Sequence, residues 1–167
     1  MERVIGKLKR KLSLVSYTDS LGQLPKIELE EIPDAYSHFL PHICFGYDRS
    51  KNVDINFTSP GTFRVKSEGS WFSLEVDIDD FSGNEYLVLI LDFSVKKTVP
   101  VKVCLRSETN GDNYYPRVLM FSENKNKIEI PINIKSHASN KSTIIIFFES
   151  ELFEVKVNEV KILLARN

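Results

Sequence analysis

Cysteine and histidine are scarce in this sequence. Among its 167 residues there are only two cysteines, Cys44 and Cys104, and no CxxC pair. Two free thiols are predicted, and the alternative is a single disulfide between them. The three histidines are too few and too scattered to form a histidine metal cage. The chain must therefore be stabilised by an ordinary hydrophobic core, which its length permits.

The sequence also lacks an excess of either charge and any long apolar run. The 22 basic and 23 acidic residues give a net charge of −1. This balance excludes a nucleic-acid binder that relies on overall positive charge, and it excludes an acidic disordered tail protein. No apolar run approaches the roughly 20 residues of a transmembrane helix. The basic residues 1–12 are not followed by the apolar stretch of a signal peptide, which predicts a cytoplasmic location.

Catalytic motifs are absent as well. The chain contains no GxSxG, no HExxH and no GxxxxGK phosphate loop. His42 is close to Cys44 in sequence, but a nucleophile and its base usually meet through the fold and not along the chain. The strand positions expected to face inward are aliphatic and carry no histidine or carboxylate cluster. The sequence therefore predicts a protein that is not an enzyme.

From residue 53 onward, polar and apolar residues alternate with the period of two that is typical of β-strands. Clusters of Gly, Asn, Asp, Ser and Pro separate the runs and mark turns. The expected strands are 53–57, 62–66, 71–79, 85–93, 99–106, 114–121, 127–134, 143–149 and 153–164. Because no helical stretch lies between them, parallel crossovers are excluded. The pattern predicts an all-β fold, an antiparallel β-sandwich or barrel.

Three details of the pattern predict register. The even-numbered residues of 72–78 and 128–134 should face the core. Pro131 cannot donate a ladder hydrogen bond, which indicates an edge strand. The inward residues are odd-numbered in 153–157 and even-numbered in 160–164, so a bulge or tight turn is expected at Asn158 and Glu159.

The first 50 residues have a different character, and we expect them to form an N-terminal extension to a sandwich domain of residues 51–167. Within residues 3–15, Ile5, Leu8 and Leu12 recur with helical spacing among lysines and arginines, which predicts a short basic amphipathic helix. The segment 16–52 is irregular, with one or two helical turns expected at 34–40. Such a short helix needs a support, so we expect it to contact a protein partner or a membrane surface.

Three segments carry a resemblance to a known family. Residues 155–163 (VKVNEVKIL) resemble the closing strand of jelly-roll carbohydrate-binding modules and their galactose-binding-like relatives. Residues 71–77 (WFSLEVD) look like their early strand, and 128–132 (IEIPI), followed by the apolar run 144–148, is similar to their penultimate pair. The resemblance covers about 53–167. It implies a jelly-roll β-sandwich that binds carbohydrate without catalysis.

The loop 107–117 contains the residue types that bind sugars. Aromatic rings stack on sugar C–H faces, while amide, carboxylate and guanidinium groups bond to hydroxyls. The candidate ligand-binding residues are Asn110, Asp112, Asn113, Tyr114, Tyr115 and Arg117, together with Trp71, which falls on the outward phase of its strand. The alternative is a hairpin turn whose tyrosines plug the end of the sandwich, with Trp71 covering that end or contacting the N-terminal segment.

A second constellation consists of carboxylates. Asp77, Asp79 and Asp80 supply hard oxygen ligands of the kind that calcium prefers, and the resembled modules often hold a structural calcium. The alternative is the solvated end of an ordinary strand. No other cofactor is expected.

The sequence therefore supports two functions. The first is a non-catalytic carbohydrate-binding sandwich, accessory to a polysaccharide-handling enzyme or system. The alternative is a structural or assembly protein whose sandwich mediates protein–protein contact.

Overall fold

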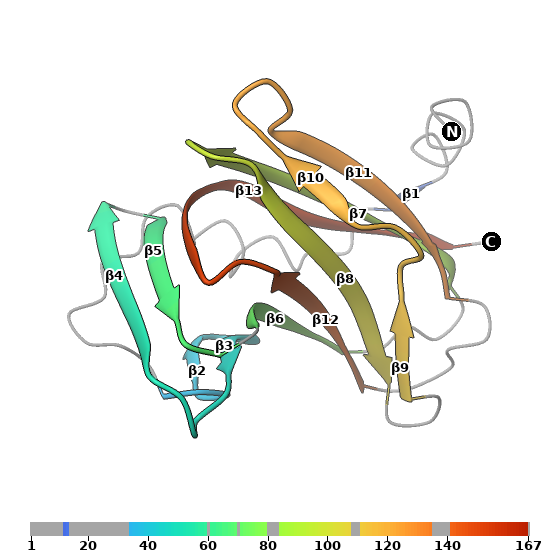
Figure 1. Cartoon of the computed structure of the whole chain (residues 1–167). Coiled ribbons are helices and arrows are strands. Elements are labelled where there is room, and N and C mark those ends of the chain that lie inside the picture. The colour runs from blue at the N-terminus through green and yellow to red at the C-terminus, as the bar shows by residue number, and fades with distance from the viewer. Residues whose placement is uncertain are drawn as a thin grey trace.

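The chain folds into two antiparallel β-sheets packed face to face (Figure 1). The structure is a computed structural model, and it describes residues 12–13, 34–59, 61–69, 71–79, 84–107, 111–134 and 141–166. The strands are β1 (Leu12–Ser13), β2 (His38–Leu40), β3 (Ile43–Tyr47), β4 (Val53–Ser59), β5 (Thr62–Ser67), β6 (Phe72–Asp79), β7 (Asn84–Val95), β8 (Val99–Ser107), β9 (Gly111–Tyr114), β10 (Leu119–Phe121), β11 (Lys127–Asn133), β12 (Lys141–Phe148) and β13 (Leu152–Arg166). The described residues include no helix, and so no helix that could span a membrane.

The sheets have six and seven strands. The six-stranded sheet has the order β11-β7-β13-β5-β4, with β1 paired to β13. The seven-stranded sheet has the order β10-β8-β12-β6-β3-β2, with β9 paired to β8. Neighbours in sequence are frequently separated in space, because β12 lies between β6 and β8 and β13 lies between β5 and β7. The expectation of an all-β antiparallel sandwich is confirmed.

Alternation along the strands builds the core between the sheets. Phe72, Leu74, Val76 and Ile78 of β6 are at most 1% exposed, as their even-numbered phase predicts. Burying each such side chain fully contributes about 1.5–3 kcal/mol relative to leaving it in water. Strand β7 is buried on both faces, because Leu87, Leu89 and Leu91 enter the main core while Val88 and Ile90 are buried on the opposite face.

Strand β11 confirms the edge position that Pro131 predicts. It ends the six-stranded sheet and pairs only with β7 along that path. Ile130 and Ile134 are buried, whereas Ile128 and Ile132 are only partly buried against the core. The prediction that the even-numbered residues face the core is thus correct, but two of them are only partly buried because the strand lies at the edge of the sheet.

The predicted irregularity in the last strand is also present. The pairing of β13 with β7 shifts register between Val157 and Glu159. The side-chain amide of Asn158 donates hydrogen bonds to Asp92 Oδ1 at 2.9 Å and Ser94 Oγ at 2.8 Å. Val157 and Val160 can therefore both face the core, at 1% and 4% exposure, although they differ in phase.

The sandwich begins earlier than the expected boundary at residue 51. Strands β2 and β3 precede that boundary, and β3 pairs with β6 along its length. Instead of helical turns at 34–40, the chain makes a turn at Ala35 and Tyr36 and then forms β2. The positive φ of 65° at both Tyr36 and His42 permits these tight turns, and the Tyr36 N–H donates to the Phe45 carbonyl at 2.7 Å. Pairing of β2 with β3 takes the place of the helical turns expected here.

Two other elements differ from expectation. The single strand expected at 114–121 is split into β9 and β10, because the chain bends at Pro116 and Arg117 between them. At the N-terminus, Leu12 and Ser13 pair with Leu164 and Ala165 as β1 and are not helical. The remainder of the predicted amphipathic helix lies outside the described residues.

Candidate functional site

The outer face of the seven-stranded sheet is built from side chains that alternate with the core residues. Strand pairing aligns them in rows across β3, β6, β12, β8 and β9. One row consists of Cys44, Glu75, Ile145, Cys104 and Tyr114, and the next consists of Gly46, Ser73, Phe147 and Lys102. A further row contains Asp77, Thr143, Arg106 and Asp112.

A cavity of about 670 Å³ opens at one end of this face, and we call it the aromatic groove. Its aromatic lining consists of Trp71, Tyr114, Tyr115 and Phe147. The Phe147 ring contacts the Trp71 ring edge-on at a centroid distance of 6.1 Å, and it stacks with Tyr114 at 6.2 Å and 25°. Tyr114 remains 55% exposed, so one face of this cluster is available to a ligand.

Charged groups border the aromatic groove. Lys102 Nζ and Glu149 Oε1 form an ion pair, and Arg117 lies exposed on the same lining. Paired charges that are fixed beside an aromatic surface can direct hydrogen bonds to a bound hydroxyl while the rings supply contact area.

The structure brings four of the predicted ligand-binding residues together. Trp71, Tyr114, Tyr115 and Arg117 all line the aromatic groove. Trp71 has the outward phase that its strand predicts and is half-buried by its contact with Phe147. Tyr115 packs partly against the core, which is the position that the alternative of a plugging tyrosine describes.

The other predicted residues of the loop lie apart from the groove. The Asp112 carboxylate accepts hydrogen bonds from Arg106 Nε at 2.7 Å and Nη2 at 3.2 Å, and these bonds lower the pKa of Asp112. Asn113 is exposed on β9 and lines a smaller cavity of about 310 Å³ behind Tyr115. Asn110 lies outside the described residues.

Sequence reasoning missed Phe147, Lys102 and Glu149. Phe147 belongs to an apolar run in which inward and outward residues have the same chemistry, so alternation gives no signal there. Lys102 does occupy the polar phase of its strand, but only the pairing of β12 with β8 places it opposite Phe147.

The predicted calcium ligands are only partly described. Asp77 Oδ2 lies 2.8 Å from His38 Nε2, and Asp77 Oδ1 accepts a hydrogen bond from Thr143 Oγ1 at 2.8 Å. A cation would have to compete with both partners. The side chain of Asp79 and the whole of Asp80 lie outside the described residues, among which no cluster of three or more metal-ligating His, Cys, Asp or Glu side chains occurs. The calcium site stays a prediction.

The row that begins with Cys44 is buried as far as Cys104, whereas Tyr114 at its end is exposed. Burial raises the pKa of Cys44 to about 12 and that of Cys104 to about 11, so both free thiols are protonated near neutral pH. Burial also raises the pKa of Glu75, which is 6% exposed, although a hydrogen bond from Ser73 Oγ at 2.9 Å opposes that rise. A protonated buried thiol is a poor nucleophile, so this row does not favour covalent catalysis.

Comparison with known proteins places the fold. No known protein-family model matches the chain, and no curated protein sequence matches it. Among solved structures, a family 4 carbohydrate-binding module is similar with a TM-score of 0.51 and 12% identity over 69% of this chain and 78% of that one. The fold is therefore a jelly-roll β-sandwich of the kind found in carbohydrate-binding modules.

Two further solved structures are similar at lower scores. The CBM22-1 xylan-binding domain of Xyn10C from Paenibacillus barcinonensis has a TM-score of 0.49 and 10% identity, over 74% of this chain and 86% of that one. A family 11 carbohydrate-binding module from Clostridium thermocellum, in complex with a β-1,3-1,4-mixed-linked tetrasaccharide, has a TM-score of 0.47 and 10% identity. The match covers 81% of this chain and 94% of that one.

Proposed function

We propose that this chain is a non-catalytic carbohydrate-binding module, accessory to a polysaccharide-handling enzyme or system, and that the aromatic groove is its binding site. The observation that carries the proposal is an aromatic cluster on the outer face of the sheet, in which the Trp71 and Tyr114 rings each contact Phe147 and Tyr114 stays exposed. The fold, which it shares with a carbohydrate-binding module, supports the same class.

The physical argument rests on the two surfaces of a sugar. A pyranose has weakly apolar C–H faces and a rim of hydroxyls, so it needs a flat aromatic contact and a few fixed polar groups. Tyr114 and Trp71 supply the first, and Lys102, Glu149 and Arg117 supply the second. Water can partly replace a lost hydrogen bond but not a lost stacking surface, so the aromatic residues should dominate affinity.

A binding experiment with matched variants tests the proposal. A glycan array identifies a ligand, and calorimetry then compares the wild type with Tyr114→Ala and Trp71→Ala. Each variant should weaken binding by roughly tenfold, on the scale of an aromatic contact. The control is Tyr86→Ala, because Tyr86 belongs to β7 in the other sheet and should leave affinity unchanged. Flat titrations for the wild type, or equal affinities for all variants, contradict the proposal and favour the alternative of a protein-binding sandwich.

A further inference from the structure

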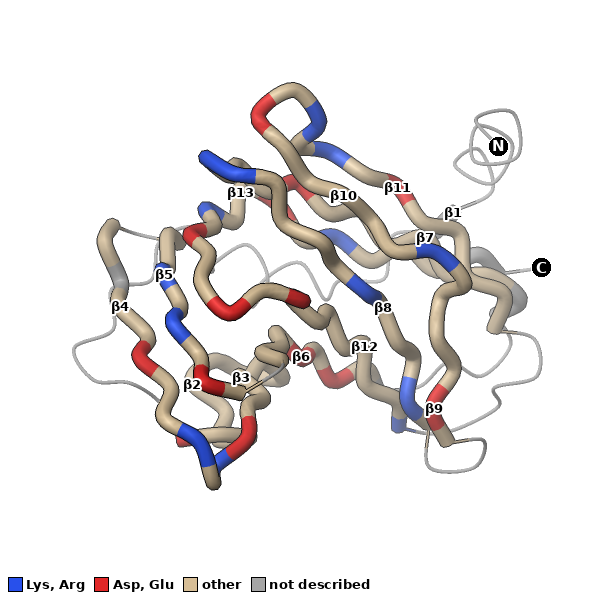
Figure 2. The backbone as a smooth tube through the Cα atoms, in the orientation of Figure 1, with Lys and Arg blue, Asp and Glu red and all other residues tan. Residues whose placement is uncertain are grey.

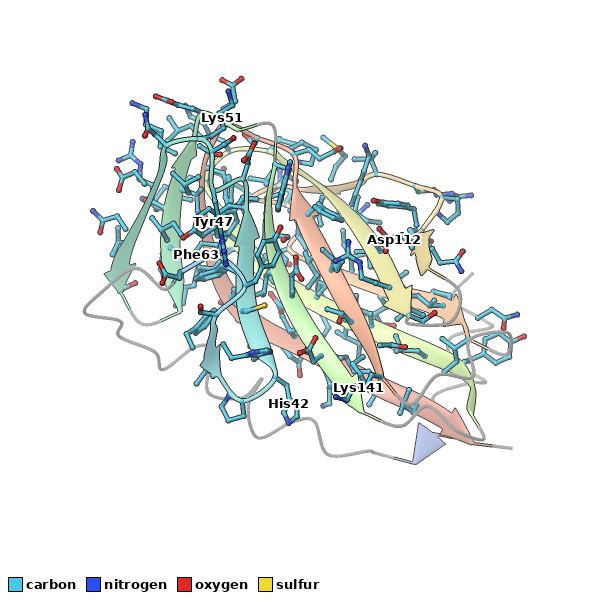
Figure 3. The ribbon with its side chains drawn as sticks, turned by 90° about the horizontal axis from the view of Figure 1, so that it is seen from below. His42, Tyr47, Lys51, Phe63, Asp112 and Lys141 are labelled. Atoms are coloured by element: carbon cyan, nitrogen blue, oxygen red, sulfur yellow. The ribbon has the colours of Figure 1, made fainter. Side chains whose placement is uncertain are left out.

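A second cavity, of about 790 Å³, lies at the other end of the same strands, and we call it the rim pocket. It wraps the end of the seven-stranded sheet, because its lining combines the outward-facing His38, Asp77, Arg106 and Thr143 with the inward-facing Ser142. Figure 3 shows His42 and Lys141, which also line it, at this same end of the molecule. Its volume lies within the range of about 300–1,000 Å³ that is usual for ligand sites.

The rim pocket differs in chemistry from the aromatic groove. In the described part of the chain, no phenylalanine, tyrosine or tryptophan lines it, so stacking cannot dominate recognition there. The Ser142 hydroxyl is buried in the lining at 4% residue exposure, and it has no hydrogen-bond partner among the described residues. A buried hydroxyl left without a partner is unfavourable, and a ligand that hydrogen-bonds to it would supply the missing partner.

The charges of the rim pocket are arranged in pairs. Arg106 binds Asp112 through two nitrogens, and His38 binds Asp77, whose other oxygen accepts from Thr143. Figure 2 shows residues of both charges on these strands, with basic positions on β8 and acidic positions on β6. An anionic ligand would therefore meet Asp77 in the lining and Asp112 beside Arg106, and a cationic one would meet Arg106 and Lys141.

Paired donors and acceptors match a ligand whose groups both donate and accept. Arg106 has five N–H groups and commits two nitrogens to Asp112, so donors remain for a ligand. Sugar hydroxyls have both roles and carry no charge. The two cavities are also within reach of one chain, since Lys102 and Arg106 are four residues apart on β8, or about 13 Å at the usual strand rise.

We propose that the rim pocket is a second saccharide subsite, which binds a neutral, hydroxyl-rich unit of the same glycan chain that occupies the aromatic groove. This inference rests on the proposed function and adds to it a substrate class. The ligand is an uncharged oligosaccharide of several units that runs along β8 and β12, and Arg106, His38 and Ser142 bind the end distant from the aromatic residues.

The test is a chain-length series measured by calorimetry on the full chain. The probes are neutral cello-, xylo- and β-1,4-galacto-oligosaccharides from disaccharide to hexasaccharide, with oligogalacturonates as the acidic comparison. Wild-type affinity should rise with length in the series that binds. Arg106→Ala and His38→Ala should each weaken the hexasaccharide by roughly tenfold and leave the disaccharide unchanged. Tyr114→Ala should weaken both lengths.

The chain offers a matched control. Lys127 and Glu159 form an exposed ion pair whose side chains are 48% and 37% exposed, close to the 47% and 36% of Arg106 and Asp112. Lys127→Ala should leave every affinity unchanged. Circular dichroism melts of all variants show whether a lost affinity reflects unfolding. Ser142→Val, which replaces the buried hydroxyl with a methyl group, is a third variant of the rim pocket that should fold.

Several results would overturn the proposal that the rim pocket is a saccharide subsite. Equal wild-type affinity for disaccharide and hexasaccharide, or full hexasaccharide affinity in Arg106→Ala and His38→Ala, would show that no sugar unit binds there. A preference for oligogalacturonates would refute the neutral class. A wild type that binds none of the probes, or a Tyr114→Ala variant that keeps full affinity for both lengths, would instead remove the proposed function, and the rim subsite with it.

Discussion

Phe147 and Phe148 are adjacent on β12 and face opposite sides of the sheet, so the same substitution at the two positions separates function from stability. Phe148 is fully buried and contacts Phe153 at a centroid distance of 4.8 Å and Phe93 at 5.8 Å. Phe148→Ala should therefore cost about 3–5 kcal/mol of unfolding free energy. For a chain of this size that cost lowers Tm by roughly 6–20 °C.

Phe147→Ala should reduce stability less than Phe148→Ala does, and it should weaken glycan binding. Phe147 lies on the partly exposed outer face, and the substitution removes two ring contacts, to Trp71 and Tyr114, each worth about 0.5–1.5 kcal/mol. Unfolding free energy should fall by about 1–3 kcal/mol, while glycan affinity falls roughly tenfold because both stacking residues lose their support. Urea unfolding and calorimetry on the two variants give both quantities. A Phe147→Ala variant that melts as early as Phe148→Ala, or that retains wild-type affinity, refutes the reasoning.

Three further predictions concern single positions. Ile130→Asp places a charge at a fully buried site and should cost several kcal/mol, on the order of the whole stability, so an unchanged thermal melt would contradict the assigned core. Gly46→Ala should destabilise the fold by about 1–3 kcal/mol in urea unfolding, because a Cβ there collides with Ser73 Oγ and Glu75 Oε1, whereas Gly69→Ala, which meets no atom closer than 3.3 Å, should cost less. The raised pKa of Glu75 means that wild-type stability falls as pH rises through the folded-state pKa. The Glu75→Gln variant should lack this fall, so its unfolding free energy should exceed that of the wild type at neutral pH. The difference in stability should shrink below the unfolded-state pKa of about 4.3. Parallel pH profiles of stability would show that the Glu75 carboxyl is not desolvated.

The parts of the fold that sequence predicted are those where local pattern and tertiary position agree. Strand β6 has an apolar face and a polar face, so its phase can be read directly, and the change of phase around Asn158 can be explained only by an added residue. Strands β2 and β3 could not be predicted in the same way. They are short, they flank Pro41, and the turn between them depends on a positive φ at His42 that a non-glycine residue rarely adopts.

The candidate site was predictable only in part for a related reason. Tyr114, Tyr115 and Arg117 are close in sequence, so their residue types alone indicated a ligand-binding loop. Their partners come from β12 and β8, and nothing in a local pattern shows which strands are neighbours. The separation of Asp112 from the groove has the same origin, because β9 pairs with β8 and thereby places Asp112 opposite Arg106.

The register of β12 connects the core to the candidate site. In the observed pairing, Phe148 lies opposite Phe72 and Val101, while Phe147 lies opposite Ser73 and Lys102. A slip by one residue would exchange the two faces, exposing Phe148 and removing Phe147 from the aromatic groove. The buried contacts of Phe148 disfavour that slip. Core packing around Phe148 thus fixes the position of Phe147 in the aromatic groove.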